Sequence, residues 1–430
     1  MKGIVFEFKL RKLIIAKIAG FFRLKGYLSR FGPFRLKDLP DPPIRGDNWV
    51  VVRTEYCGIC GSDTKQVFLH GNRDNPLIGL ISFPQVLGHE VVGTIVRTGP
   101  FVNIRIGTRI TLYPNISCKP RNLPPCKACQ EGDYTLCRNF THGNLSPGIH
   151  TGNSSDATGG FAELLPAHEW MVFPIPDGIT WKQAIIADPF SVAFHSILKV
   201  LPSPGSICAV YGCGTLGLLT IQILKHVFEG LTVIAIARFP HQADMAKQFG
   251  ADIILKHRPT QKIIEQIASY VNCDVYYING KKPWLIEGVD FLFDTVASNE
   301  TLEIGLRIVK AREKVSNNTN LDLISTPGAI VMTGVSTPKR FEWTPWYFKE
   351  IRIIGSNAFG DETFEGRREH AYKHYFKFLN EGLFDPSPII THTFPLKKFK
   401  DALVTTAKQK KNKSIKVILT HKTNRQVDIK

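Results

Sequence analysis

The stretch SICAVYGCGTLGLLTIQILKHVF, residues 206–228, decides the fold of the middle of the chain. A short apolar run leads into a glycine-rich turn, after which apolar residues recur at the period of a helix. Downstream, LTVIAIARF, GVDFLFDTVA and GAIVMTGV have the composition of buried strands, and QADMAKQFGAD has that of a helix. Strands that alternate with helices predict a parallel sheet with right-handed connections.

Three glycines in this stretch, Gly212, Gly214 and Gly217, have the spacing G-x-G-x-x-G. The spacing alone is a weak signal, but here it lies between a predicted strand and a predicted helix. At such a junction the loop, which here includes Thr215 and Leu216, brings backbone amides and a helix N-terminus to a pyrophosphate. The sequence therefore predicts a dinucleotide site, with a purely structural glycine turn as the alternative.

The choice of dinucleotide depends on the end of the next predicted strand. About twenty residues past the last glycine, an acidic residue would bind the ribose 2′-hydroxyl of NAD. Ala237 and Arg238 stand there instead. The missing carboxylate removes a repulsion, and a guanidinium can hold a 2′-phosphate. We therefore favour NADP(H) over NAD(H); the alternative is that Arg238 only stacks on the adenine.

The length of the chain, 430 residues, favours two domains. Residues 1–192 contain many glycines, prolines and short β-branched runs such as NWVVVRTEY, which predict a mostly antiparallel β domain. We expect a dinucleotide-binding domain over residues 193–337. After it the chain should leave the parallel sheet, so that residues 338–430 rejoin the first domain. The predicted fold class is α/β, a doubly wound parallel sheet plus a mostly β domain.

The net charge of +17 is concentrated near the start of the chain. From Lys9 to Lys37 there are nine basic residues and no acidic one, and residues 397–416 are again rich in lysine. Residues 9–28, KLRKLIIAKIAGFFRLKGYL, alternate basic and apolar residues at roughly helical spacing, in runs too short to span a bilayer. We expect a basic amphipathic helix within the fold, in preference to peripheral membrane contact. No aromatic-basic RNA motif is present, so no nucleic acid is expected.

Most of the nine cysteines lie in two clusters. No secretory signal peptide is recognisable, so we expect reduced thiols or metal ligands in a cytoplasmic protein, not disulfides. The first cluster lies in YCGICGSDTKQ, residues 56–66, where the C-x-x-C pair alone fits a redox couple or half of a zinc knuckle. Downstream, VLGHEVVGTIV adds His89 and Glu90. A thiolate, an imidazole and carboxylates are the ligands of a catalytic zinc with an open position.

Several of these segments, in this order, resemble the zinc-dependent medium-chain alcohol dehydrogenases, in the branch with sorbitol, threonine and glucose dehydrogenases. The resemblance extends over nearly the whole chain, except for the basic insert near residues 9–30. It implies a GroES-like catalytic domain, a Rossmann domain, and a homodimer or homotetramer. The matching segments are GICGSD at 58–63, GHE at 88–90, a cysteine lobe, ADPFSVAFHSI at 187–197 and the glycine fingerprint.

The resemblance also implies roles for single residues. Cys60 would be a ligand of the catalytic zinc and His89 a second one, whereas Cys57 would be an ordinary buried thiol. Glu90 would be a ligand or a close exchange partner. Asp188, followed by a proline, stands where many members have a Glu-Pro pair, so it would contact the metal directly or through water, or else serve as a helix N-terminal carboxylate.

Two further residues follow from the same resemblance. Ser62 would relay the alcohol proton, although a serine in a turn often only caps a helix. Asp63 would accept a hydrogen bond from the ring of His89 and so fix its tautomer.

The second cysteine cluster resembles the structural zinc lobe of the family, with one departure. Family members usually have three cysteines separated by two residues each, then a fourth after seven. Here the last three keep that spacing, Leu123 occupies the expected first position, and Cys118 lies upstream of it. We expect the intervening segment to loop back and complete a site of four thiolates, with an empty or three-thiol lobe as the alternative. The four cysteines are Cys118, Cys126, Cys129 and Cys137.

The resemblance implies reversible hydride transfer between NADP(H) or NAD(H) and an alcohol, polyol or sugar. One alternative is a zinc-free quinone or enone reductase on the same scaffold, which the pair Cys60 and His89 disfavours. Another is a nucleotide-sensing protein without catalysis that binds RNA or a membrane surface through its basic patches.

Overall fold

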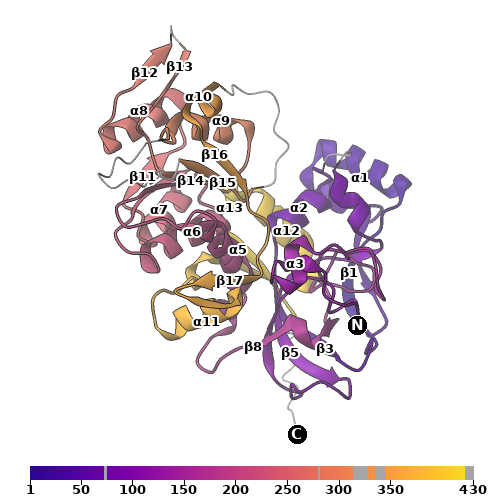
Figure 1. The fold of residues 1–430 in the computed structure, drawn as a ribbon. Coiled ribbons are helices and arrows are strands. Elements are labelled where there is room, and N and C mark those ends of the chain that lie inside the picture. Colours follow the sequence, from indigo (N-terminus) through magenta and orange to yellow (C-terminus); the bar gives the residue numbers. More distant parts are fainter. Residues whose placement is uncertain (72–74, 279–280, 313–327, 335–343, 422–430) are drawn as a thin grey trace. The chain divides into compact units, whose positions relative to one another are not determined.

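The computed structural model describes residues 1–71, 75–278, 281–312, 328–334 and 344–421. The chain forms two units, both visible in Figure 1. The first comprises Met1–Asp188, Tyr372–Phe376 and Ser387–Lys430, and the second comprises Pro189–Ala371 and Lys377–Pro386. The chain thus returns to the first unit late in its sequence.

The first unit is built on a seven-stranded sheet. Its strands follow in the spatial order β19 (Ile390–Pro395), β20 (Lys416–Thr420), β3 (Trp49–Gly58), β5 (Glu90–Thr98), β6 (Arg109–Leu112) and β8 (Val172–Pro174), with β7 (Leu164–His168) paired to β3. Only β19 and β20 are parallel to each other among these pairs. The mostly antiparallel β domain is therefore confirmed.

Strand β3 lies in the middle of this sheet and explains an otherwise ambiguous run of three valines. Val50, Val51 and Val52 are all fully buried. A strand that is covered on both faces reads as a continuous apolar run, because side chains on either side of the sheet meet protein and not water. The C-terminal end of this buried strand leads directly into the first cysteine cluster.

A smaller sheet begins the chain. It consists of β2 (Phe34–Asp38), β1 (Lys2–Phe6) and β4 (Gln85–Val86) in that order. The predicted basic helix is present at Leu10–Phe22. The helices of this unit are α1 (Leu10–Phe22), α2 (Gly61–Val67), α3 (Lys127–Gln130), α4 (Trp181–Ala184), α12 (Phe399–Ala407) and α13 (Gln409–Asn412), while α5 (Ala187–Leu198) and α11 (Ala371–Asn380) have residues in both units.

The second unit contains the predicted parallel sheet. Its order is β11 (Ile253–Lys256), β10 (Thr232–Ala237), β9 (Ile207–Tyr211), β14 (Phe291–Asp294), β15 (Ala329–Met332) and β16 (Arg352–Gly355), and every pair is parallel. Because successive strands run outward from β9 in both directions, the strand order reverses beside β9. In doubly wound sheets a ligand binds at this reversal, beyond the carboxyl ends of the strands.

The helices and hairpins of the second unit complete the Rossmann-like arrangement. Ile234, Leu292 and Ile330 on the sheet pack with Ile263 and Ile304 on two of the helices. The helices are α6 (Thr215–His226), α7 (Pro240–Gln248), α8 (Thr260–Val271), α9 (Asn299–Ile308) and α10 (Thr344–Lys349), and the hairpins pair β12 (Tyr276–Ile278) with β13 (Lys281–Trp284) and β17 (Asp361–Phe364) with β18 (Arg367–His370).

The sheet extends further along the sequence than we expected. The expectation that the chain leaves it after Pro338 is wrong for β16, which pairs with β15 through residues Arg352–Gly355. Strand β16 is the sheet edge and none of its residues is fully buried. An edge strand with one covered side has no long apolar run, so its sequence resembles that of a loop. The domain boundaries given above remain predictions.

Candidate active site

The pairing of β3 with β5 brings together the residues that we expected to bind a catalytic zinc. Gly58, at the end of β3, lies opposite Glu90, at the start of β5. Cys60 follows just beyond β3 and immediately precedes α2, and His89 immediately precedes β5. Two adjacent strand ends therefore supply a thiol, an imidazole and a carboxylate at one place.

Two glycines permit this close arrangement. Gly88 has a φ of +92°, in the left-handed region where a side chain is strained, and its turn places His89 and Glu90. A Cβ atom at Gly58 would lie 1.9 Å from Oε2 of Glu90. The carboxylate thus packs against bare backbone, which explains why glycines stand beside both sequence motifs.

The donor atoms fit a zinc ion. Cys60 Sγ, a ring nitrogen of His89 and a carboxylate oxygen of Glu90 all lie within 4.8 Å of one another. The Nδ1 atom of His89 is buried, and in the described part of the chain it has no hydrogen-bond partner. A thiolate, an imidazole and a carboxylate at such separations are ligands that zinc takes in catalytic sites.

The charges around His89 also favour a cation at this place. Burial lowers the pKa of His89, but the hydrogen bond to Cys60 and the negative charge of Asp63 outweigh it and raise the pKa well above its usual value. The protonated ring supplies positive charge that the cluster of acidic groups requires. A divalent ion would supply the same charge.

Asp63 lies close to this cluster but makes another hydrogen bond. Its Oδ2 accepts from the backbone N–H of Cys60 at 2.9 Å, which joins the first turn of α2 to the residue before it. Its Oδ1 is 3.9 Å from Nδ1 of His89, too far for a hydrogen bond. Burial raises the pKa of Asp63. Its predicted hydrogen bond to the His89 ring stays a prediction.

The other two predicted residues differ in exposure. Ser62 is exposed in the first turn of α2, two positions after Cys60. Asp188 is 6% exposed in the first turn of α5, and its oxygens are outside the 4.8 Å cluster. Burial, and to a lesser extent the charge of Glu90, raise the pKa of Asp188 to about 7. The roles of both residues stay predictions.

The second cysteine cluster is assembled as expected. Ligand atoms of all four cysteines lie within 4.8 Å of one another, with Cys118 Sγ and Cys137 Sγ 3.6 Å apart. The backbone N–H of Leu123 donates to the carbonyl of Cys118 at 3.0 Å, closing the turn that returns Cys118 to the lobe. Sulfurs around a tetrahedral zinc at about 2.3 Å would be about 3.8 Å apart. The four thiols therefore have the spacing of a structural zinc site.

The glycine turn after β9 has the three properties that a pyrophosphate site needs. Gly212 has a φ of +93°, and a Cβ there would lie 2.5 Å from Val296 Cγ2. A Cβ at Gly217, in the first turn of α6, would lie 1.8 Å from the carbonyl oxygen of Gly212. A Cβ at Gly214 would meet no atom within 4 Å. The first and third glycines allow close packing, while the second leaves open space beside a helix N-terminus.

The neighbouring strand ends carry positive charge. Arg238 is exposed directly after β10, and its Cζ is 5.4 Å from the centre of the Phe239 ring. In the parallel register Ala237 lies beside Lys256, the last residue of β11, and Arg258 follows two positions later. The carboxyl ends of β10 and β11 thus present cations at the same edge of the sheet.

Comparison with known families decides between the remaining interpretations. The family described as "Alcohol dehydrogenase GroES-like domain" matches residues 46–177, which include both groups of metal-ligating side chains. The family described as "Zinc-binding dehydrogenase" matches residues 215–371. The chain belongs to the zinc-containing medium-chain alcohol dehydrogenases. The resemblance inferred from the motifs is thereby confirmed.

Individual relatives of this dehydrogenase are similar over nearly their whole length. Sorbitol dehydrogenase of Bacillus subtilis (strain 168) is 26% identical over 90% of this chain and 93% of its own. L-threonine 3-dehydrogenase of Yersinia pestis (strain Pestoides F) is 27% identical over 90% and 95%. In fold, the chain matches a solved structure described as a short chain alcohol dehydrogenase (rspB) from E. coli CFT073 complexed with NADH, at 23% identity, a TM-score of 0.69 and coverage of 98% and 99%.

The class of activity follows from this membership. The dehydrogenase uses zinc and NAD(H) or NADP(H) and acts on CH–OH donors, in the polyol and threonine dehydrogenase branch of the superfamily. This membership excludes both alternatives for the main function, namely zinc-free reduction and nucleotide sensing without catalysis.

Two side chains near the cluster were missed from the sequence. Lys416 in β20 forms a buried ion pair with Glu90. Burial alone would lower the pKa of Lys416, but the Glu90 carboxylate raises it above the usual value. A lysine within the apolar segment SIKVILT, 414–420, was the available signal, because a lone charge in a buried strand needs a partner.

The second missed residue of the dehydrogenase is His150. Its ring centre is 4.7 Å from that of His89, and its Nδ1 donates to the carbonyl of Thr151 at 2.7 Å. Burial, followed by the charge of His89, lowers the pKa of His150 to about 3. The ring is therefore neutral and its Nε2 is an acceptor. No motif in the sequence marks this loop histidine.

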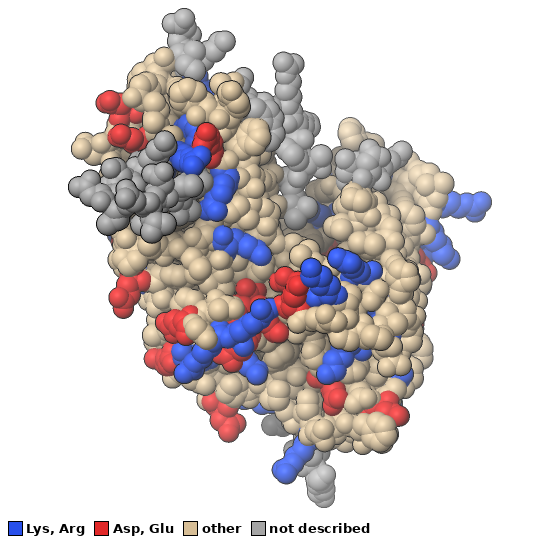
Figure 2. Space-filling view, viewed as in Figure 1, with Lys and Arg blue, Asp and Glu red and all other residues tan. Residues whose placement is uncertain are grey.

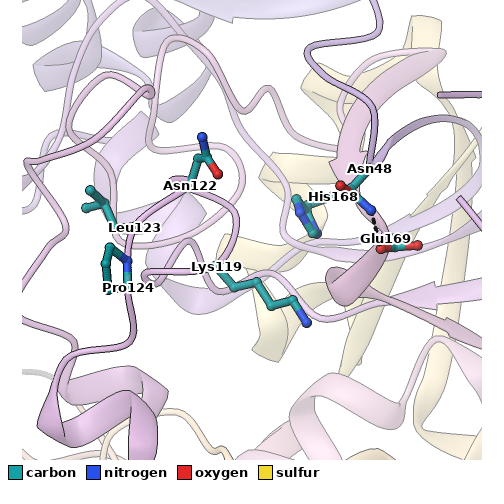
Figure 3. Close-up of a pocket in the computed structure, with 7 residues that line it drawn as sticks. All are labelled: Asn48, Lys119, Asn122, Leu123, Pro124, His168 and Glu169. Carbon is teal, nitrogen blue, oxygen red and sulfur yellow. Dashed lines mark hydrogen bonds between the residues drawn. The ribbon is translucent and has the colours of Figure 1, made fainter. Parts of the chain in front are cut away.

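Figure 3 shows the residues that line a separate pocket of about 540 Å³. Lys119, Asn122 and Leu123 line it from the loop after Cys118, and Asn48 Nδ2 donates to Glu169 Oε1 on the facing side at 2.7 Å. Its lining includes none of the residues of the catalytic cluster. The pocket is therefore distinct from the catalytic cluster.

Proposed function

We propose that this dehydrogenase interconverts a secondary alcohol of a small polyol and the corresponding ketone, and that it prefers NADP(H). The observation that carries the proposal is the convergence of Cys60, His89 and Glu90 within 4.8 Å. The similarity to sorbitol dehydrogenase and to L-threonine 3-dehydrogenase supports a substrate with neighbouring polar groups on its carbon chain.

In this proposal Cys60 and His89 hold the catalytic zinc, together with Glu90 or Asp188. When bound, zinc supplies Lewis acidity that lowers the pKa of an alcohol hydroxyl. Glu90 is already within 4.8 Å of the other two donors, whereas Asp188 is not. We therefore assign Glu90 as a direct ligand and Asp188 as a residue that orients water.

The remaining residues position groups and move the proton. Ser62, exposed next to the cluster on α2, passes the alcohol proton toward solvent through its hydroxyl. Asp63 fixes the backbone that carries Cys60 through its 2.9 Å hydrogen bond. His150, neutral and oriented by Thr151, limits the rotation of the His89 ring that it packs against. The glycine turn after β9 would hold the dinucleotide, which would supply the hydride acceptor or donor.

The preference for NADP(H) rests on the charges at the edge of the parallel sheet. Arg238 stands where an acidic residue would repel a 2′-phosphate, and Lys256 and Arg258 end and follow the adjacent strand. A guanidinium can hold a phosphate through charge attraction and two parallel hydrogen bonds.

A ligand substitution tests the proposed chemistry. Cys60→Ser should abolish turnover of a polyol panel and lower the zinc content, while NADPH binding, followed by nicotinamide fluorescence, stays near the wild-type value. Cys273→Ser, at a half-buried cysteine in the second unit, is the matched control and should keep both activity and metal. Full turnover by Cys60→Ser would contradict zinc catalysis at this cluster.

A second substitution tests the cofactor preference. Arg238→Asp should reduce kcat/KM for NADPH relative to NADH by about tenfold to a hundredfold, the range expected for a charged hydrogen bond of about 1.5–3 kcal/mol. Arg352→Asp, at an exposed arginine on the opposite edge strand, should leave the ratio unchanged. A wild-type enzyme that prefers NADH would refute the assignment.

A further inference from the structure

The outward face of α1 is apolar. Leu10, Ile14, Ile18 and Phe22 follow at four-residue intervals, so they share one side of the helix, and all are exposed. Ile15 and Phe21 lie alongside them and are also exposed. Phe21 is 86% exposed, Phe22 77% and Leu10 73%, values that belong to polar side chains in most surface helices.

The opposite side of α1 holds the helix on the first unit. Ala16 is fully buried, and Leu13 packs against the hydrophobic core of that unit. The helix is therefore apolar on both sides, and only the inner side is covered in the structure. The apolar exposure continues at both flanks, where Phe8 is 58% and Phe31 57% exposed.

Basic side chains flank the outer face, and most of them have no acidic partner among the described residues. Glu7 is already occupied by ion pairs with three basic residues, and Lys25 pairs with Asp401 at 2.9 Å. In Figure 2, basic side chains project at the edge of the first unit that carries α1. In the described ranges, the basic residues of this segment without an ion pair are Lys9, Arg11, Lys17, Arg23 and Arg30.

We propose that this face of α1 binds in the plane of an anionic lipid surface, with the phenylalanines in the headgroup boundary and the five free cations at lipid phosphates. An exposed apolar stripe flanked by lysines and arginines has this affinity, because burial and charge attraction act together. Helix α1 has 13 residues, and no described helix is long and apolar enough to cross a bilayer, so the contact is peripheral.

A second copy of the chain fits this face less well. In a symmetric dimer the same patch lies on both partners, so each set of five unpaired cations would face the other. Like charges at an interface are unfavourable. An anionic lipid surface offers negative headgroups to the basic residues and acyl chains to the apolar side chains. The family match begins at residue 46, so the segment that carries the face lies outside it, and it is separate from the zinc cluster in sequence.

Vesicle flotation tests the proposal. The full-length enzyme should float with vesicles of phosphatidylcholine and phosphatidylglycerol, remain in solution with phosphatidylcholine alone, and detach between 0.1 and about 0.5 M salt, where screening shortens the reach of surface charges. The double variant Phe21→Glu, Phe22→Glu should bind the anionic vesicles at least tenfold more weakly while kcat stays unchanged. Phe101→Glu, at a 65% exposed phenylalanine elsewhere in the first unit, should bind like the wild type.

Other outcomes would overturn the proposal. Absence of flotation with anionic vesicles, or flotation that the double variant keeps, would show that α1 does not carry the contact. Light scattering on the same samples tests self-association as the competing use of this face. If the wild type is an oligomer, the double variant is a monomer and neither binds vesicles, the face belongs to a contact between copies of the chain. A variant Lys9→Glu, Arg11→Glu, Lys17→Glu, which leaves the phenylalanines in place, should also lose anionic binding; retained binding would refute the electrostatic part.

Discussion

The ammonium group of Lys416 and the carboxylate of Glu90 form an ion pair in the interior of the first unit, where each side chain is 3% exposed. The two residues come from β20 and β5, which both flank β3 in the sheet. The Lys416 ammonium also lies 3.4 Å from the carbonyl of Ile59, next to Cys60. When no zinc is bound, this pair neutralises a carboxylate that would otherwise be buried without a partner.

Replacing Lys416 should therefore destabilise the enzyme. In the zinc-free enzyme, Lys416→Met leaves the Glu90 carboxylate buried and unpaired, which costs about 3–5 kcal/mol of the free energy of unfolding. Lys416→Arg keeps the charge and should lose less. Urea unfolding of the zinc-free proteins, monitored by circular dichroism, measures the free energy of unfolding of each variant. Lys411→Met, at an exposed lysine in α13, should change the value by less than about 0.5 kcal/mol. Equal stabilities of Lys416→Met and the wild type would contradict the role of this pair.

The four-cysteine lobe should hold its own metal. Purified enzyme is expected to contain about two zinc ions per chain, one in each donor cluster. Cys118→Ser should lower the content to about one, because three thiolates bind zinc more weakly than four. Mass spectrometry of the metal after dialysis gives the count. If the wild type contains one zinc and Cys118→Ser the same, the lobe is without metal.

The glycine turn gives a prediction that separates folding from binding. Because a Cβ at Gly214 meets no atom within 4 Å, Gly214→Ala should keep the melting temperature. The added methyl group would occupy the space for the pyrophosphate, so the Kd for NADPH should rise at least about tenfold, equivalent to 1.4 kcal/mol. Gly355→Ala, where the Cβ also meets nothing, is the matched control and should bind NADPH normally. An unchanged Kd in Gly214→Ala would place the cofactor elsewhere.

Gly217→Ala should behave differently from Gly214→Ala. Its Cβ would lie 1.8 Å from the Gly212 carbonyl oxygen, so the turn itself must shift. We expect a lower melting temperature as well as weaker NADPH binding. A melting temperature equal to the wild-type value would show that the turn can relax.

A buried lysine in the second unit should make stability depend on pH. Lys349 donates to the carbonyls of Leu285 and Val309, and burial lowers its pKa to about 7. In the unfolded chain a lysine keeps a pKa of about 10.4, so between pH 7 and 10 the unfolded state binds the extra proton. The contribution of Lys349 to the free energy of unfolding therefore rises with pH in that window, by up to about 1.4 kcal/mol per pH unit.

The comparison of Lys349→Met with the wild type isolates this effect. The free energy of unfolding of the wild type, relative to the variant, should increase from pH 7 to pH 10, whatever constant amount the lost hydrogen bonds cost. Lys247→Met, at an exposed lysine, should show a difference that does not vary with pH. A constant difference for Lys349→Met would mean that the ammonium remains charged in the folded state.

The sequence predicted those parts of the fold that depend on local patterns. The strand, glycine turn and helix at 206–228 could be recognised because each has its own period or composition, and the C-x-x-C and G-H-E motifs lie at strand ends where turns are marked by glycine. The return of Cys118 to its lobe was also predictable, since the spacing of the other three cysteines left one ligand missing.

The rest depended on contacts between distant segments. Lys416 reaches Glu90 only because β20 pairs with β3 across the sheet, and no local pattern near residue 416 indicates that partner. His150 comes from a loop without periodicity. Strand β16 lacks the apolar run of a central strand, so its place at the sheet edge could not be separated from a loop. The outer face of α1 looked like an ordinary amphipathic pattern until burial showed which side is covered.

The late position of β20 has a consequence for biosynthesis. A ribosome makes Cys60, His89 and Glu90 long before it makes Lys416, and the whole parallel sheet is translated in between. Until the last strand emerges and inserts beside β3, Glu90 lacks the buried lysine with which it pairs in the finished enzyme. A transcript cut short ahead of that strand would thus yield a polypeptide with all of its proposed zinc ligands and an unfinished active site.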